Sequence, residues 1–324
     1  MAQLRAGIDL GGTKIQAIVA DDQHKVLAAA RQPTPTGGGA DGVVAALTAA
    51  VRDAADHAGV STRELAGVGL GSPGDVDDEK GVISNASNLS GFDKPVEVAA
   101  KLRADLGVER VRLGNDVSVA TQAEFELGAA RDYRSLLGVF WGTGVGGGLI
   151  LDGREWHGRG AAGEIGHMVV ELNGARCPCG RLGCMEAYAG RRAMEAEARR
   201  LHDKGERTEL FKIMRDRGRD RLTAGVWHRA WRHEDKLALR LLDRAYEAMA
   251  AAVASAVNLL DVEAVVLGGG MGIRFGEVAR ARLEKQMLPH TFNDDRPPAV
   301  VLASLGDLGG ALGAALLLDG KAGS

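Results

Sequence analysis

The chain has 324 residues, which is too long for one ordinary hydrophobic core and predicts two lobes. Hydrophobic residues make up 45% and charged residues 26%, and the net charge of −3 gives no electrostatic reason to expect binding to nucleic acid or to an anionic membrane. No apolar run reaches the roughly 18–20 residues that a membrane helix needs, and no signal-peptide core opens the chain, so we expect a cytoplasmic protein.

The first glycine-rich turn lies between two predicted strands, residues 4–10 and 15–20. Its residues are Gly11, Gly12, Thr13 and Lys14. A Walker P-loop joins a strand to a helix and has a longer glycine spacing, so this is not one. Backbone N–H groups here could still form a nest for phosphate, with a hydroxyl from Thr13, while Lys14 points either at phosphate or at solvent. Asp9, inside the first strand, is suited to hold Mg²⁺ through water. A plain hairpin turn is the alternative.

The rest of the first lobe is predicted to alternate strands and helices. The expected strands are 25–30, 68–71 and 108–113, and the expected helices are 40–58, 95–106 and 117–127. A polar loop, 84–92, carries the amide of Asn88, which could bind a polyol or serve turn formation. Asn115 and Asp116 follow the third of these strands and precede a helix. That position suits a functional residue at a cleft, but local sequence alone favours the alternative, which is helix capping by Asn115 or Asp116.

A second glycine-rich segment follows a predicted strand at 136–141. Its residues 142–148 read GTGVGGG and match the dinucleotide pattern GxGxxG, which is meaningful only where a helix follows. Here a short apolar run, 149–151, leads to an Asp-Gly hairpin signal, so we reject a Rossmann site. We expect the two glycine turns to hold one phosphate chain. The phosphate-binding residues expected in this segment are Gly142, Thr143, Gly144, Gly146 and Gly147.

The stretch 164–186 contains all three cysteines of the chain and predicts a metal site. Three thiolates and one imidazole form a complete tetrahedral ligand set for Zn²⁺, which leaves no open position, so the zinc should be structural. The expected ligands are His167, Cys177, Cys179 and Cys184. The alternative is three reduced cysteines beside an unrelated histidine. We expect the metal to fix a loop that presents Glu164 and Glu186 to a small substrate, with the second ring nitrogen of His167 facing a substrate hydroxyl.

The remainder of the chain is mainly helical. Helices are expected at 187–203, 236–260, 275–286 and 307–318, with strands at 264–267 and 299–303. The charged segment 204–234 should be a largely solvated helical insertion, in which two tryptophans form a packing stripe or a dimer contact. Gly268, Gly269 and Gly270 form a turn entering a helix, where a flat base or ribose could approach the backbone. The predicted lobes are 1–117 with 305–324, and 118–304.

Seven motifs occur in the order seen in the ROK family, which comprises sugar kinases and sugar-responsive repressors. They are GIDLGGTK at 7–14, GSPGDVD at 71–77, NLSGF at 88–92, GND at 114–116, GTGVGGG at 142–148, GEIGH at 163–167 and CPCGRLGCME at 177–186. The chain therefore resembles this family over nearly its whole length apart from 204–234. The resemblance implies an α/β fold of the two-lobed actin/hexokinase (ribonuclease H-like) type, with a cleft between the lobes, usually in a homodimer.

The resemblance also implies roles for individual residues. Asp116 would be the catalytic base. The sugar hydroxyls would be bound by Asn88, Asn115, Glu164, His167 and Glu186. The nucleotide phosphates would be held by Gly11, Gly12, Thr13, Thr143 and Gly144, with Gly268–Gly270 near adenosine. Structural Zn²⁺ would sit on His167 and the three cysteines, and ATP with Mg²⁺ would supply the phosphoryl group.

These implications favour an ATP-dependent glucokinase. N-acetylglucosamine, N-acetylmannosamine, mannose or fructose remain alternative substrates, polyphosphate an alternative donor, and a non-catalytic sugar-binding regulator an alternative function. The family's repressors carry an N-terminal winged helix-turn-helix, and this sequence starts at the first strand, which disfavours that role. Ser90 stands where many members have proline, which leaves the fit to a particular sugar open.

Overall fold

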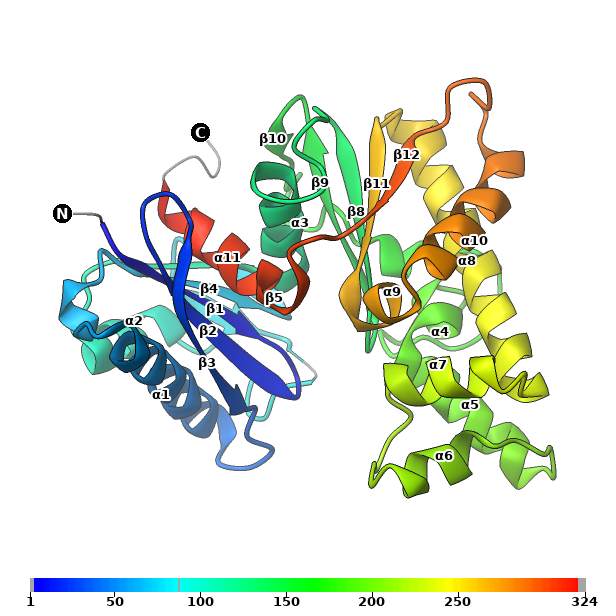
Figure 1. Cartoon of the computed structure of the whole chain (residues 1–324), viewed down its shortest axis with the longest axis horizontal. Helices are drawn as coiled ribbons and strands as arrows, with labels where there is room; N and C mark the ends of the chain where they lie inside the picture. The colour runs from blue at the N-terminus through cyan, green and yellow to red at the C-terminus, as the bar shows by residue number, and fades with distance from the viewer. Residues whose placement is uncertain (1–2, 87, 320–324) are drawn as a thin grey trace. The chain divides into compact units, whose positions relative to one another are not determined.

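The computed structural model describes residues 3–86 and 88–319 of the chain. Internal contacts divide the chain into two compact units, Met1–Gly128 with Ser304–Ser324, and Ala129–Ala303. Each unit is built on one five-stranded sheet (Figure 1). Among the described residues, no helix is both long and apolar enough to cross a membrane.

The sheet of the first unit has the order β3-β2-β1-β4-β7. Its strands are β1 (Arg5–Leu10), β2 (Lys14–Ala20), β3 (Val26–Pro33), β4 (Val68–Ser72) and β7 (Val111–Asn115), and a separate hairpin is formed by β5 (Asp75–Asp77) and β6 (Val82–Ser84). The first three strands are antiparallel, whereas β1, β4 and β7 are parallel. The predicted strand–turn–strand arrangement around Gly11–Lys14 is therefore confirmed.

Helices cover both faces of this sheet (Figure 1). They are α1 (Gly39–Ala58) and α2 (Val98–Leu106) on one side, and α3 (Asp116–Glu126) and α11 (Gly309–Leu316) on the other. Gly7 of β1 and Gly69 of β4 are register partners, and both lie beneath α11. A Cβ on Gly7 would come within 1.9 Å of the Ala311 carbonyl oxygen, and one on Gly69 within 1.8 Å of the Ala314 carbonyl oxygen. The absence of side chains at these two positions sets the close approach of α11.

The sheet of the second unit has the order β10-β9-β8-β11-β12. Its strands are β8 (Leu136–Trp141), β9 (Val145–Leu151), β10 (Arg154–Glu155), β11 (Ala264–Gly268) and β12 (Ala299–Leu302). The sheet repeats the pattern of the first unit, because an antiparallel hairpin, β8–β9, is continued by two parallel strands. The turns at Gly11–Thr13 and Gly142–Gly144 thus occupy equivalent places, each linking the central strand of its sheet to the next.

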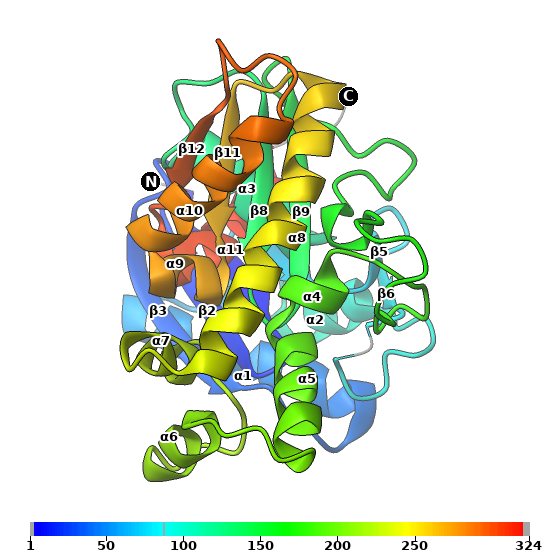
Figure 2. The ribbon, with the colours of Figure 1, turned by 90° about the vertical axis from the view of Figure 1, so that its right-hand side faces the viewer.

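Helices surround the second sheet. They are α4 (Glu186–Ala189), α5 (Arg191–Asp203), α6 (Leu210–Asp216), α7 (Ala224–Arg232), α8 (Lys236–Leu260), α9 (Gly269–Phe275) and α10 (Glu277–Met287). The longest, α8, crosses one side of the sheet (Figure 2), and its buried alanines and leucines share a core with β8 and β11. The sheet and these helices together make one hydrophobic core for the unit.

The structure corrects several sequence expectations. The segment 204–234 is helical as predicted, but it is not largely solvated: Leu210 and Trp227 are fully buried, so Trp227 is unavailable for a dimer contact. Strand β9 begins at Val145, inside the run predicted to be a turn. Contacts place α3 in the first unit, because it packs against α11, so the chain changes unit after residue 128 and not after the expected 117.

Candidate functional site

The first glycine turn is closed by one backbone hydrogen bond. The N–H of Gly11 donates to the carbonyl oxygen of Lys14 over 2.9 Å, and Thr13 is exposed at the tip. Asn88, from the polar loop, lies against this turn: a Cβ on Gly12 would be 3.0 Å from the Asn88 Nδ2 atom. A predicted sugar ligand and the predicted phosphate turn are therefore neighbours in the first unit.

Charged groups lie beside the same turn. The Lys14 Nζ atom is 3.3 Å from the Oδ1 atom of the exposed Asp307, so Lys14 is paired with a carboxylate. Burial raises the pKa of Asp9 above its ordinary value, and the nearby Lys14 charge offsets only part of that effect. Carboxylates in such a position suit a hard cation such as Mg²⁺.

Asn115 and Asp116 stand where β7 gives way to α3. The Asn115 Oδ1 atom accepts from the backbone N–H groups of Val117, at 3.1 Å, and Ser118, at 3.2 Å, so the capping interpretation is confirmed for Asn115. Asp116 is the first residue of α3 and is partly buried; its Oδ1 atom accepts from Val117 at 3.0 Å. Capping occupies the amide oxygen of Asn115, while its NH₂ group donates no hydrogen bond within the described residues and can donate to a ligand.

The second glycine turn is connected through Glu186 to the zinc loop, as we call residues 164–186, which contain the predicted metal ligands. The Glu186 Oε2 atom accepts from the N–H of Val145 at 2.8 Å. A Cβ on Gly144 would lie 2.1 Å from the same oxygen, and a Cβ on Gly166 would lie 2.0 Å from the Val145 carbonyl oxygen. Two glycines are thus required for Glu186 and the GEIGH segment to approach the turn.

The start of α5 orients the peptides of this turn. The N–H of Arg191 donates to the Gly142 carbonyl oxygen at 3.2 Å, and the N–H of Arg192 donates to that of Thr143 at 3.0 Å. Because the C=O and N–H of a trans peptide point in opposite directions, the N–H groups of Thr143 and Gly144 point away from α5. Neither N–H donates a hydrogen bond within the described part of the chain. Two adjacent unused donors form an anion-binding arrangement.

Arg191 is a contact residue that the sequence did not single out. Its Nη2 atom donates to the Thr143 Oγ1 atom at 2.9 Å. It lies in an arginine-rich helix with no motif around it, so no local signal distinguished it from its neighbours.

The third glycine segment has the predicted strand-to-helix form. Strand β11 ends at Gly268, and α9 begins at Gly269, whose φ of +77° favours glycine. A Cβ on Gly269 would also meet the Trp141 carbonyl oxygen at 2.5 Å. Gly270 is exposed, with no atom within 4 Å of its would-be Cβ, so a ligand could approach the backbone there.

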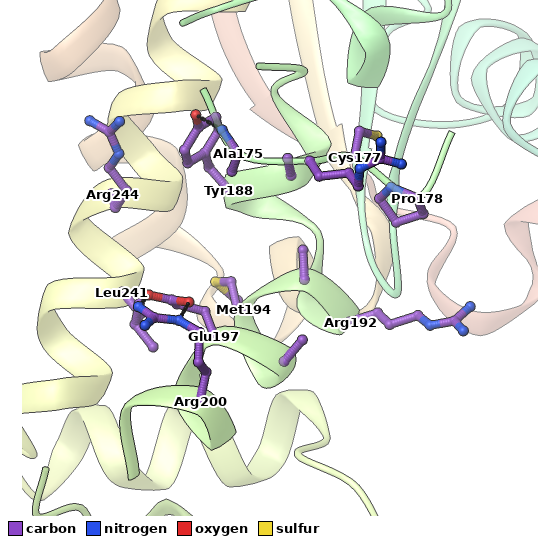
Figure 3. A pocket seen from close by; sticks show the side chains of 14 residues that line it. Ala175, Cys177, Pro178, Tyr188, Arg192, Met194, Glu197, Arg200, Leu241 and Arg244 are labelled. Carbon is purple, nitrogen blue, oxygen red and sulfur yellow. Dashed lines mark hydrogen bonds and ion pairs between the residues drawn. The ribbon is translucent and has the colours of Figure 1, made fainter. Parts of the chain in front are cut away.

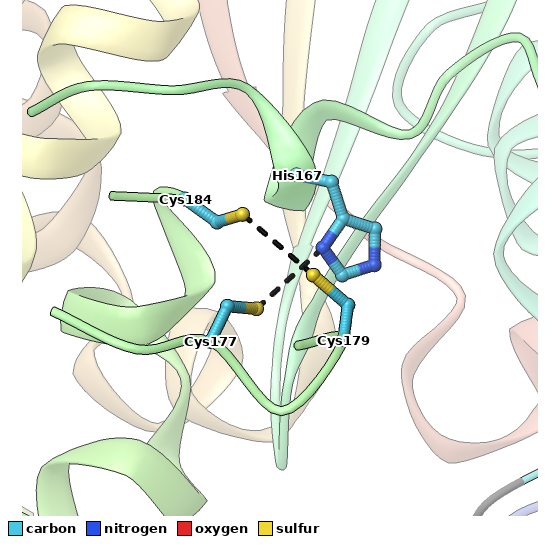
Figure 4. A group of neighbouring side chains, drawn as sticks. All are labelled: His167, Cys177, Cys179 and Cys184. Atoms are coloured by element: carbon cyan, nitrogen blue, oxygen red, sulfur yellow. Dashed lines mark hydrogen bonds between the residues drawn. The ribbon is translucent and has the colours of Figure 1, made fainter. Parts of the chain in front are cut away.

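The four predicted metal ligands converge (Figure 4). The ligand atoms of His167, Cys177, Cys179 and Cys184 all lie within 4.8 Å of one another. The Sγ atoms of Cys179 and Cys184 are 3.8 Å apart, and the Cys177 Sγ atom is 3.7 Å from the His167 Nδ1 atom. Sulfur atoms about 2.3 Å from a tetrahedral zinc would be about 3.8 Å apart, so the donor set and its spacing fit Zn²⁺.

The thiols of the cluster lie in different electrostatic surroundings. Burial raises the pKa of the Cys177 thiol to about 12, and the Glu186 carboxylate contributes in the same direction. A thiolate-binding cation would offset both effects. The other ring nitrogen of His167, Nε2, is turned toward Glu164, whose Oε2 atom is 3.8 Å away. That gap is too long for a hydrogen bond, so both groups remain able to contact a ligand.

A cavity of about 650 Å³ lies on another side of the zinc loop (Figure 3). Its wall includes Cys177 and Pro178, with Tyr188 of α4 and the apolar side chains of Met194 and Leu241. None of the predicted sugar or phosphate ligands lines it. Arginine side chains at its edge, including Arg192 and Arg244, extend in different directions and do not converge on one point. This cavity is therefore separate from the candidate site.

Comparison with known proteins assigns the family. The model of the ROK family matches residues 5–321. The chain is 30% identical to a glucokinase of Thermotoga maritima over 98% of each chain, and 32% identical to an N-acetyl-D-glucosamine kinase of Pectobacterium atrosepticum over 96% of this chain and 97% of that protein.

A solved structure agrees over the whole fold. The crystal structure of a ROK family glucokinase from Streptomyces griseus, in complex with glucose and AMPPNP, superposes with a TM-score of 0.82 at 30% identity and covers 97% of this chain and 98% of that one. The predicted two-sheet α/β fold of the hexokinase-like type is confirmed. The chain therefore belongs to the ROK family, as a sugar kinase of that family.

Proposed function

We propose that the chain transfers the terminal phosphoryl group of ATP to a hydroxyl of a hexose, with glucose as the preferred acceptor. Relatives that are 30–32% identical to the chain include a glucokinase and an N-acetyl-D-glucosamine kinase, and a similar solved structure holds glucose and AMPPNP. These names support a hexose kinase. They leave the acceptor open between glucose and its N-acetylated derivative.

The observation that carries the proposal is in the second unit. Glu186 binds the backbone of the glycine turn through one carboxylate oxygen, while its other oxygen is 3.9 Å from the Cys177 Sγ atom of the metal cluster. The same turn presents the unused N–H groups of Thr143 and Gly144. An anion-binding turn and a loop of polar groups are thus held by one carboxylate, which is the arrangement a kinase needs for a phosphate and a sugar side by side.

Each predicted residue has a place in the reaction. The hexose hydroxyls would be bound by Asn88, Asn115, Glu164, His167 and Glu186. Asp116 would orient the reacting hydroxyl and accept its proton. A carboxylate is a weak base, so the proton should move late, as the sugar oxygen bonds to phosphorus. When bound, Mg²⁺ neutralises phosphate charge, with Asp9 placed to hold it through water.

The glycine turns would account for nucleotide binding. Backbone N–H groups stabilise phosphate charge without reorganising during the reaction, which makes preorganised turns effective in phosphoryl transfer. The proposed phosphate contacts are Gly11, Gly12, Thr13, Lys14, Gly142, Thr143, Gly144, Gly146 and Gly147, with Gly268, Gly269 and Gly270 near adenosine. Zn²⁺ on His167 and the three cysteines would be structural, because the four ligands complete its coordination.

A coupled kinase assay tests the proposal. Glucose, N-acetylglucosamine, N-acetylmannosamine, mannose and fructose should each be tested with ATP and with polyphosphate. We expect the highest kcat/KM for glucose with ATP. A higher value for an N-acetylated sugar would retain the kinase and replace the acceptor. No turnover with any pair, together with sugar binding by calorimetry, would instead establish a sugar-binding regulator.

A further inference from the structure

Helix α5 carries a ladder of charged side chains on one face. Arg191, Glu195 and Arg199 are spaced four residues apart, so they project from the same side of the helix. Two ladder residues contact each other: the Arg199 Nη2 atom donates to the Glu195 Oε1 atom at 2.6 Å. The Glu195 side chain, in the middle of the ladder, is only 14% exposed, whereas Arg199 is 44% exposed.

The ladder binds the backbone of residues 220–222, which belong to the charged segment 204–234. The Arg191 Nη1 atom donates to the Leu222 carbonyl oxygen at 3.0 Å, and the Leu222 N–H donates to the Glu195 Oε2 atom at 2.9 Å. The Arg199 Nη2 atom reaches the Asp220 carbonyl oxygen at 3.5 Å. Because the Leu222 side chain is fully buried in the core, this stretch of backbone is a firm anchor for the ladder.

The first residue of the ladder also reaches the glycine turn. The guanidinium of Arg191 is shared between the Leu222 carbonyl oxygen and the Thr143 Oγ1 atom, at 3.0 and 2.9 Å. A guanidinium can only donate hydrogen bonds, so the Thr143 hydroxyl must accept from it. Its own O–H is then left to donate to another acceptor. At this turn the expected acceptor is a phosphate oxygen.

We propose that Arg191 is a positioning residue for the phosphate turn: braced by residues 220–222, it holds the Thr143 hydroxyl as a donor to the nucleotide. This inference rests on the proposed function, and it gives the charged segment a role, which is to anchor the turn without contacting ligand. A lysine could keep the charge but not both hydrogen bonds, because only the planar fork of arginine spans two acceptors at fixed geometry.

The test uses Arg191→Met, which keeps the length of the side chain and removes its donors. We expect the KM for ATP and the Kd for AMPPNP, by calorimetry, to rise about tenfold, which corresponds to the loss of one charge-assisted hydrogen bond. The KM for the sugar should change less than twofold. Arg191→Lys should recover part of the loss. Arg192→Met is the matched control, because the neighbouring Arg192 side chain is exposed and donates no hydrogen bond within the described residues.

A double-mutant cycle with Thr143→Val separates positioning from general damage. If Arg191 acts through the hydroxyl, Arg191→Met should add little to the loss already caused by Thr143→Val. Fully additive effects, or an unchanged Kd for AMPPNP in Arg191→Met, would overturn the proposal. Should Arg191→Met fail to fold, Arg191→Lys and Glu195→Gln carry the same measurements.

Amide hydrogen exchange gives a readout that needs no turnover. In the ligand-free protein, the hydrogen-bonded amides of residues 142, 145 and 146 should exchange faster in Arg191→Met than in the wild type or in Arg192→Met. Unchanged exchange would contradict the positioning role of Arg191 even if the enzyme is an active kinase. Conversely, if exchange is faster in Arg191→Met but the wild type phosphorylates no sugar, the proposed function is wrong and the positioning role of Arg191 is still supported.

Discussion

At the scale of single residues, Asp116 carries the most direct prediction about catalysis. Asp116→Asn keeps an oxygen for the hydrogen bond with the Val117 N–H but removes the base. We expect kcat to fall by about 10²–10⁴-fold, the usual contribution of general-base catalysis, with a nearly unchanged Kd for the sugar. Calorimetry and a coupled assay measure the two quantities. Glu126→Gln, at the other end of α3, removes the same charge as a control, and a near-normal kcat in Asp116→Asn would exclude Asp116 as the base.

Asp9 carries a prediction about stability. Burial raises its folded-state pKa above the unfolded value of about 3.9, so the folded chain favours the protonated form. Its contribution to stability is therefore present at low pH and lost as pH rises through the folded-state pKa. Asp9→Asn should unfold at a higher temperature than the wild type at pH 7, and the difference should shrink as the buffer is acidified.

Thermal unfolding of the wild type and Asp9→Asn, measured from pH 7 down to acidic pH in buffer without Mg²⁺, tests this prediction. Asp56→Asn is the control, since Asp56 is exposed on α1 and does not act on Asp9. A less stable Asp9→Asn protein at pH 7 would mean that the Lys14 charge outweighs burial. If Asp9 also holds Mg²⁺, Asp9→Asn should be more stable than the wild type but a poor kinase. A residue that lowers the stability of the fold is then retained for its function.

At the scale of elements, the contact of α11 with β1 and β4 depends on two glycines. Gly69→Ala would place a Cβ 1.8 Å from the Ala314 carbonyl oxygen, so the helix must move away from the sheet. We expect a loss of about 1–3 kcal/mol in the free energy of unfolding, measured by denaturant titration followed by circular dichroism. Gly37→Ala, in a loop with no atom within 4 Å of the new Cβ, should leave the stability unchanged. Equal stability of the two variants would contradict this account of the packing.

The same scale shows what the sequence could predict. The two glycine turns and the metal ligands were predicted because their signals are local: apolar runs on either side of a turn, and cysteines close together in the chain. The burial of segment 204–234 was not, since its charged residues outnumber the apolar ones that α6 and α7 turn inward. The hydrogen bond from Arg191 to Thr143 joins residues 48 positions apart, and the periodicity of a sequence cannot predict such a contact. The roles of Asp116 and the sugar ligands stay predictions.

At the scale of the whole molecule, the two units repeat one sheet pattern but differ in what stabilises them. The first has no cysteine and relies on its core, whereas the second contains all three cysteines and the metal cluster. All four tryptophans, Trp141, Trp156, Trp227 and Trp231, also belong to the second unit. Tryptophan fluorescence therefore reports unfolding of the unit that contains the metal cluster, while circular dichroism reports both.

This difference makes the structural role of zinc testable by chelation. The loop from His167 to Cys184 has few regular elements, so a metal that links its ends should stabilise the second unit. If the metal contributes about 3 kcal/mol, its removal should lower the fluorescence-detected Tm by roughly 6–12 °C. Mild acid should act in the same direction, because thiols must lose their protons to bind metal as thiolates. Cys179→Ser should show the lowered Tm without chelator and no further response to it. Zinc added back should restore the wild type alone. If neither chelator nor added zinc changes the Tm of the wild type, the cluster binds no metal that stabilises the fold.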